Sequence, residues 1–199
     1  MATSSNNLSD TALLIVDLQN DFLHPDGAYG RAGQQSDAIA ALPQRLKPVA
    51  DRIRNAGGWI VSTQFTLVGG RQGEPFISPH LKKLRPFLQK GDFCSGEWGH
   101  QLVDLLQPAD LVIEKVAYSA FYQSRLEFVL KKAAITRLVV CGIVTNGGVA
   151  STVRGAHVLD FDVTVLSDGC AAYSSQAHNA AIADLSSIVT VTTCNEAST

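Results

Sequence analysis

The sequence lacks the marks of several large protein classes. Its four cysteines are scattered and include no C-x-x-C pair, so neither a disulfide framework nor a zinc spacing is indicated. The five histidines form no H-x-H or H-x-x-x-H pair. No apolar run reaches the length of a membrane span, so we expect no contact with the bilayer.

Charge of one sign is also scarce. Sixteen basic and eighteen acidic residues give a net charge of −2, whereas nucleic-acid-binding proteins usually carry a basic excess, so we expect no nucleic-acid partner. Residues 1–10 are rich in Ser and Asn and lack the basic-then-apolar pattern of a signal peptide. We expect them to form a frayed tail before one domain over 11–199 of a cytoplasmic protein, with secretion without a recognisable signal as the alternative.

What the sequence does contain is a regular alternation of strand-like and helix-like segments, which favours a parallel sheet with right-handed crossovers. Apolar runs predict strands over 11–16, 59–63, 111–114, 138–141, 163–166 and 188–192. Helical periodicity and capping residues predict helices over 36–55, 124–134, 149–159 and 175–185. The long irregular stretch 65–99, with a short helix near 80–84, is typical of a lid or an interface.

Polar residues follow the predicted strands where a parallel sheet places ligands. Asp17 follows the first strand, Gln64 the second and Lys115 the third, and a glycine-rich turn over 142–148 follows the fourth. An Asp–Lys pair at that edge can pass a proton to or from a substrate, and amides at a helix N-terminus favour negative charge. Each feature alone is more typical of a turn former or a solvated charge, but their convergence on one edge favours an active site.

Three motifs give a resemblance over residues 12–193. They are L-L-I-V-D-L-Q-N-D-F (13–22), E-K-V-A-Y-S-A-F (114–121) and C-G-I-V-T-N-G-G-V-A-S-T-V-R (141–154). The chain resembles the isochorismatase-like hydrolase superfamily, which includes nicotinamidases and N-carbamoylsarcosine amidases. The resemblance implies an α/β protein: a single three-layer α/β/α domain with a six-stranded parallel sheet. It also implies a homo-oligomer, either a dimer or a tetramer, whose only other partner is a small-molecule substrate.

The resemblance also implies a catalytic triad of Asp, Lys and Cys, which this chain carries only in part. Asp17 and Lys115 match its first two members, while Gly148 stands where the family has its nucleophilic Cys. Because the true isochorismatases also have Gly there, we expect hydrolysis of the enol ether of isochorismate to pyruvate and a dihydroxy-dihydrobenzoate. Asp17 would be the general acid, and Lys115 would orient it or bind a substrate carboxylate. Gly148 would leave room for the enolpyruvyl arm without a covalent intermediate.

The same resemblance implies further site features. Substrate contacts are expected from Gln64, Tyr118, Phe121, Val144, Thr145 and Gly147. A non-proline cis peptide is expected at Val144–Thr145. The D-x-H metal motif of nicotinamidases is absent after the first strand, so we expect neither a metal nor another cofactor.

Two alternatives stay open, the first of them in two forms. One is a C–N hydrolase of a small amide or ureide that activates water directly, and the V-T-N sequence at 144–146 is closer to this amidase branch. In that case Gly148 is either natural or an engineered Cys→Gly replacement at that position. Another is a binding or scaffolding protein that has lost its nucleophile, although it retains both Asp17 and Lys115.

Overall fold

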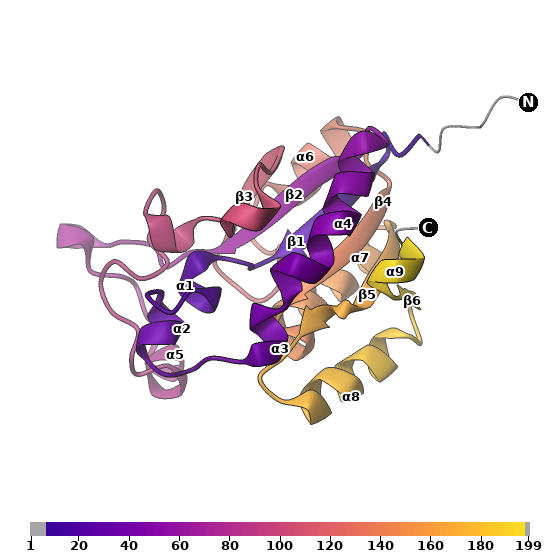
Figure 1. The fold of residues 1–199 in the computed structure, drawn as a ribbon. Helices are drawn as coiled ribbons and strands as arrows, with labels where there is room; N and C mark the ends of the chain where they lie inside the picture. The colour runs from indigo at the N-terminus through magenta and orange to yellow at the C-terminus, as the bar shows by residue number, and fades with distance from the viewer. Residues whose placement is uncertain (1–6, 198–199) are drawn as a thin grey trace, which may run out of the picture.

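A six-stranded parallel sheet forms the middle layer of the protein, described here over residues 7–197 from a computed structural model (Figure 1). The strands are β1 Thr11–Val16, β2 Trp59–Phe65, β3 Leu111–Lys115, β4 Arg137–Ile143, β5 Asp162–Ala171 and β6 Thr190–Thr192. Their order is β3-β2-β1-β4-β5-β6. The chain therefore builds outward from β1 in one direction and from β4 in the other, and a crevice forms at the carboxyl ends where that direction changes.

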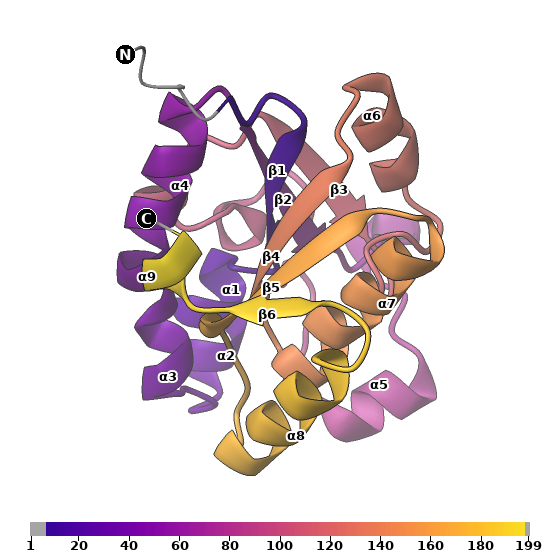
Figure 2. The same cartoon turned by 90° about the vertical axis from the view of Figure 1, so that its right-hand side faces the viewer.

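Helices cover both faces of the sheet (Figure 2). One face carries α3 Asp37–Ala40, α4 Leu42–Asn55 and α9 Cys194–Ala197; the other carries α6 Leu126–Lys132, α7 Ala150–Val158 and α8 Ser175–Leu185. Three short helices lie in the segments that follow β1 and β2, namely α1 Asn20–Leu23, α2 Ala28–Arg31 and α5 Pro79–Leu84. This arrangement confirms the predicted three-layer α/β/α fold.

Strand β1 shows why the sheet needs both helical layers. All six of its residues are buried. Leu14 and Val16 pack into the core beneath α6, α7 and α8, whereas Leu13 and Ile15 pack into the core beneath α4 and α9. A strand that is apolar on both sides fits only between two layers, as the continuous apolar run predicts.

Two predicted helices differ in their bounds. The helix expected over 36–55 is divided into α3 and α4, and Pro43 occupies the first turn of α4, where the missing N–H of proline costs nothing. Helix α6 is shorter than the predicted 124–134. The Ser124 hydroxyl accepts from the N–H of Leu126, and Glu127 pairs with Lys131, so the expected capping box between Ser124 and Glu127 does not form.

The last three residues of the expected N-terminal tail, 8–10, are attached to the domain. The Leu8 N–H donates to the Ala56 carbonyl, and the Asp10 carboxylate pairs with Arg137 at 2.5 Å. Residues 1–6 of the expected tail lie outside the described residues. Within the described part of the chain, no helix has the length and apolar character needed to cross a bilayer.

Candidate active site

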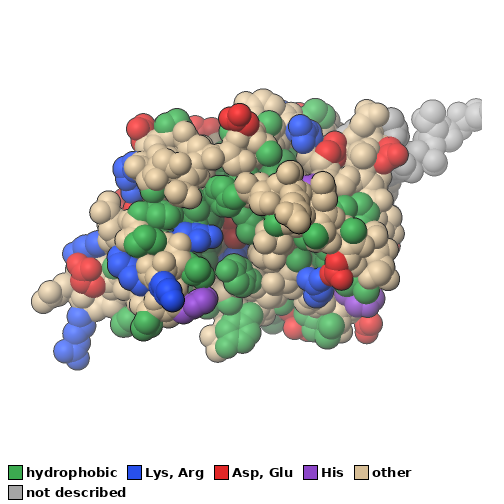
Figure 3. Space-filling model, turned by 90° about the horizontal axis from the view of Figure 1, so that it is seen from below, with side chains coloured by type: hydrophobic (Ala, Val, Ile, Leu, Met, Phe, Trp, Pro, Cys, Tyr) green, Lys and Arg blue, Asp and Glu red, His purple; other side chains and the backbone are tan. Residues whose placement is uncertain are grey.

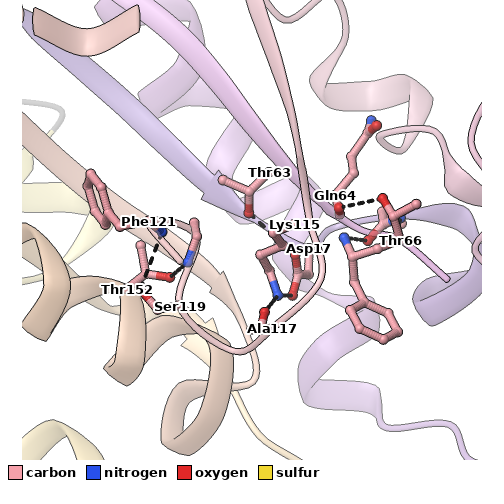
Figure 4. A network of polar contacts seen from close by, with 12 residues as sticks. Asp17, Thr63, Gln64, Thr66, Lys115, Ala117, Ser119, Phe121 and Thr152 are labelled. Atoms are coloured by element: carbon pink, nitrogen blue, oxygen red, sulfur yellow. Dashed lines mark hydrogen bonds and ion pairs between the residues drawn. The ribbon is translucent and has the colours of Figure 1, made fainter. Parts of the chain in front are cut away.

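A buried ion pair lies at the carboxyl edge of the sheet (Figure 4). The Lys115 ammonium is 2.7 Å from Oδ2 of Asp17, and both residues are at most 5% exposed. Lys115 also donates to the Ala117 carbonyl at 2.9 Å, and the Thr63 hydroxyl donates to Oδ1 of Asp17 at 3.3 Å. Every polar atom of the pair therefore has a partner, as burial of charge requires.

The sheet register brings these residues together although they are far apart in sequence. Strand β2 lies between β1 and β3, with Val16 opposite Thr63 and Phe65 opposite Lys115. Asp17 is the first residue beyond β1, and its φ of 56° places it in the left-handed region, which Asp tolerates better than most residues. This backbone conformation ends the strand at the residue that carries the carboxylate.

Burial and charge act in opposite directions on Asp17. Burial is the larger influence and raises the pKa of its carboxyl above the ordinary value, while Lys115 and Thr63 lower it. A carboxylate with a raised pKa is a stronger base than an exposed one and can also hold a proton at a higher pH. The pair is thus suited to proton transfer in either direction.

Gly148 faces the pair from the turn after β4. A Cβ built on Gly148 would lie 3.2 Å from Oδ2 of Asp17, 3.0 Å from the Ile143 carbonyl oxygen and 3.3 Å from a Val16 methyl. A side chain at this position would therefore be directed at the carboxylate.

The turn itself is a short π-helical segment, Thr145–Val149, that leads into α7. The cis peptide bond lies at Ile143–Val144, one bond earlier than the predicted Val144–Thr145. Thr145 is fully buried, and its hydroxyl is 2.8 Å from Nδ1 of His178 on α8. Sequence analysis missed His178, because only the fold brings α8 against the turn.

Of the remaining predicted substrate contacts, three lie at the turn. Gly147 is buried, Val144 is half-buried, and a Cβ built on Gly147 would lie 3.5 Å from the Tyr118 ring. Tyr118 is 64% exposed, so its ring lies over the turn on the open side of the site.

The structure does not bring Gln64 or Phe121 to the pair. Gln64 is one residue beyond Thr63 in β2, and because side chains alternate along a strand, it points away from Asp17 and Lys115 (Figure 4). Phe121 stacks on Phe161 with ring centroids 5.8 Å apart and packs beside Gly155 of α7. The hydroxyl that contacts Asp17 from β2 belongs to Thr63, which sequence analysis missed.

One face of the molecule is hollowed. Figure 3 shows a hollow bordered mainly by hydrophobic side chains, with acidic and basic side chains visible within it. No existing cysteine supplies the missing thiolate: Cys141 and Cys170 are buried, and burial raises their pKa well above the ordinary value. Among residues 7–197, no three His, Cys, Asp or Glu residues are grouped so that they could hold a metal ion.

Comparison with known sequences identifies relatives over most of the chain. The isochorismatase domain family matches residues 11–196. The chain is similar to the ureidoacrylate amidohydrolase RutB of Caulobacter segnis, with 36% identity over 79% of this chain and 71% of that protein. It is also similar to the enzyme of the same name from Pantoea ananatis, with 35% identity over 79% of this chain and 68% of that protein.

Solved structures share the fold. A cysteine hydrolase from Pseudomonas syringae superposes with a TM-score of 0.81 at 21% identity, over 96% of this chain and 91% of that one. An N-carbamoylsarcosine amidase from Thermoplasma acidophilum superposes with a TM-score of 0.71 at 21% identity, over 94% of this chain and 97% of that one.

These relatives show that our expectation of isochorismate ether hydrolysis is wrong. The similar sequences are named as amidohydrolases, and the solved structures include an amidase and a nicotinamidase. The error came from giving Gly148 more weight than the V-T-N sequence at 144–146, which resembles the amidase branch. That sequence was the signal in the chain that agrees with the names of these relatives.

Proposed function

The chain belongs to the isochorismatase family of hydrolases, and we propose that it hydrolyses a C–N bond in a small amide or ureide. The observation that carries this proposal is the position of Gly148, from which a Cβ would lie 3.2 Å from Oδ2 of the buried Asp17–Lys115 pair. The similarity to ureidoacrylate amidohydrolases supports the amide class of bond.

Water replaces the protein nucleophile in this proposal. A water molecule beside Gly148 donates a proton to Asp17 as its oxygen adds to the substrate carbonyl, which gives a tetrahedral intermediate. The intermediate collapses with cleavage of the C–N bond, and the proton held by Asp17 passes to the leaving nitrogen. Lys115 keeps Asp17 ionised before the reaction and positions its Oδ2.

The raised pKa of Asp17 is consistent with this role. A base must be ionised to accept a proton, and its strength increases with its pKa. Burial raises the pKa and so supplies the basicity, while the ammonium of Lys115 and the hydroxyl of Thr63 act in the opposite direction and favour the ionised form.

The test is ammonia release from a panel of small ureides and amides, measured for the wild type, Asp17→Asn and two variants of Gly148. We expect slow release by the wild type and a loss of about 100-fold or more in Asp17→Asn, because general-base catalysis contributes that much. Gly148→Cys would place a thiol beside the same base, and release should rise at least about 100-fold. Gly148→Ala adds the same Cβ without the sulfur and is the matched control.

Two results would contradict the proposal. Release by Gly148→Cys without any release by the wild type would identify a binding protein that retains the site but not the reaction. No release from any compound by either protein would reject C–N hydrolysis.

A further inference from the structure

The Lys115 ammonium has three N–H donors, and two of them have oxygen acceptors. One donates to Oδ2 of Asp17 at 2.7 Å and another to the Ala117 carbonyl at 2.9 Å. The part of the chain that the structure describes offers no third oxygen; instead, Nζ lies over the ring of Phe65, 5.5 Å from its centroid. That distance is within the range of a cation–π contact, in which the negative face of an aromatic ring attracts a cation.

The sheet register brings this ring to the ammonium. Phe65 is the last residue of β2 and lies directly opposite Lys115, the last residue of β3. Residues opposite each other on neighbouring strands point to the same face of the sheet, with their backbones only about 5 Å apart. The Thr66 N–H donates to the Lys115 carbonyl at 2.9 Å, which continues the pairing beyond the end of β2.

A buried amide holds the backbone of Phe65 in place. Gln19 is fully buried, and its side chain bonds both main-chain groups of Phe65. The Phe65 N–H donates to Oε1 of Gln19 at 2.8 Å, and Nε2 of Gln19 donates to the Phe65 carbonyl at 3.0 Å. Because Gln19 is two residues beyond Asp17, one short segment carries the carboxylate and also fixes the residue whose ring meets its cation.

The ring of Phe65 also covers the ammonium. Lys115 is 2% exposed, whereas Phe65 is half-buried. The rings of Phe93 and Phe22 pack against Phe65, with centroids at 5.3 Å and 6.4 Å, and support it from the side of the segment that follows β2. A ring that keeps water from the ammonium strengthens the attraction between the ammonium and the Asp17 carboxylate.

We propose that Phe65 is a positioning residue, whose ring holds the Lys115 ammonium against Oδ2 of Asp17 and so fixes the direction of the base. The inference rests on the function proposed above, in which Asp17 accepts a proton from the reacting water. An aromatic ring suits this role because it attracts a cation without offering a charged acceptor. A carboxylate at the same place would compete with Asp17 for the ammonium.

Fluorination of the ring tests the proposal, because each added fluorine weakens the negative face and changes the shape of the side chain little. The proteins carry mono-, di- or trifluorinated phenylalanine in place of Phe65, and Phe65→Leu and Phe65→Tyr complete the series. The matched control carries trifluorinated phenylalanine in place of Phe87. Phe87 is also half-buried in the aromatic cluster, but its ring contacts the Tyr29 ring edge-on and not the ammonium.

We expect kcat for ammonia release to fall with each fluorine, by about 2- to 30-fold over the series, which is the range for one cation–π contact. KM should change little, because the ring acts through Lys115. Phe65→Leu should lose at least as much as the trifluorinated protein, whereas Phe65→Tyr keeps the ring face and should retain most of the activity. The Phe87 control should behave like the wild type.

A second measurement does not need turnover. Carbon-13 NMR titration of Asp17 should show its pKa rising with each fluorine, because Lys115 lowers that pKa and would be held less firmly. A rise in a protein that releases no ammonia would support the positioning of Lys115 and reject only the proposed hydrolysis.

Three results would overturn the positioning role. Constant kcat and constant pKa across the fluorinated proteins would show that Phe65 acts by its shape alone, and ammonia release would leave the proposed hydrolysis standing. A change in KM at constant kcat would assign the ring to substrate binding. A fall in the pKa of Asp17 would show that the ring draws the ammonium away from the carboxylate.

Discussion

Asp17 and Asp21 are two buried carboxylates four residues apart, and the structure uses them in opposite ways. Asp17 faces a cation, Lys115, and retains a place at the open edge of the sheet. Asp21 accepts from the backbone N–H groups of Ala28 at 2.9 Å and Phe93 at 2.6 Å. It thereby connects the start of α2 to the segment between β2 and β3, and Gly99 packs so closely on it that a Cβ there would lie 2.4 Å from its carboxylate.

The difference shows that burial alone does not make a carboxylate reactive. Asp21 is about as buried as Asp17, but the donors that it meets are backbone N–H groups, which hold it in a structural role. Asp17 has a partner that a proton transfer can use and a neighbouring residue without a side chain. We therefore expect that substitutions at Asp17 and its ion pair will affect activity, whereas substitution of Asp21 will affect mainly stability.

The largest effect should come from breaking the ion pair. Lys115→Met keeps much of the volume of the side chain but leaves Asp17 buried without its cation, and we expect a loss of about 3 kcal/mol or more in the free energy of unfolding. The pKa of Asp17 should rise further, because Lys115 now lowers it. Urea unfolding measures the loss; unchanged stability would mean that the pair contributes no more than a surface contact.

A smaller effect is expected at the structural acid. In Asp21→Asn one backbone donor would face an amide NH₂ group, and we expect a loss of about 2 kcal/mol in the free energy of unfolding. Ammonia release by the folded variant should change far less than in Asp17→Asn. Loss of activity equal to that in Asp17→Asn would place Asp21 in the reaction and end the distinction between the two carboxylates.

The smallest effect should be seen in the titration of Asp17. Its raised pKa means that the folded state keeps the proton to a higher pH than the unfolded state, so its contribution to stability is greatest at low pH and is lost as the pH rises through the raised value. Thr63→Val removes a donor to the ionised form and should raise the pKa of Asp17 further. Carbon-13 NMR titration, assigned with Asp17→Asn, measures this; a fall in the pKa would contradict it.

The carboxyl ends of three strands could be predicted from the sequence. Apolar runs mark where each strand ends, and the parallel topology places these ends at one edge of the sheet. Asp17, Lys115 and Gly148 all follow such runs, and the structure brings them to one edge. The direction of the Gln64 side chain could not be predicted from the apolar run. A polar residue at the end of such a run can lie on either face of the sheet. Thr63 lies inside the predicted strand, where threonine is common because it is β-branched, so its hydroxyl gave no sign of a functional role.

The surroundings of Phe65 could not have been predicted from apolar runs and topology. The strand predicted over 59–63 ends before Phe65, whereas β2 continues to it and so brings its ring into the site. Its neighbours Gln19 and Phe93 come from other parts of the chain, and only tertiary packing brings them together. Within the irregular stretch 65–99 Phe93 is fully buried, whereas Phe76 and Trp98 are exposed.

The segment over 66–110 leaves from β2 and returns to β3, which are adjacent strands of the sheet. The two ends of the segment therefore lie close together. We expect that its length and sequence can change without disturbing the strands that hold the ion pair. Exchanging this segment between relatives should change ligand preference without changing the reaction at the ion pair.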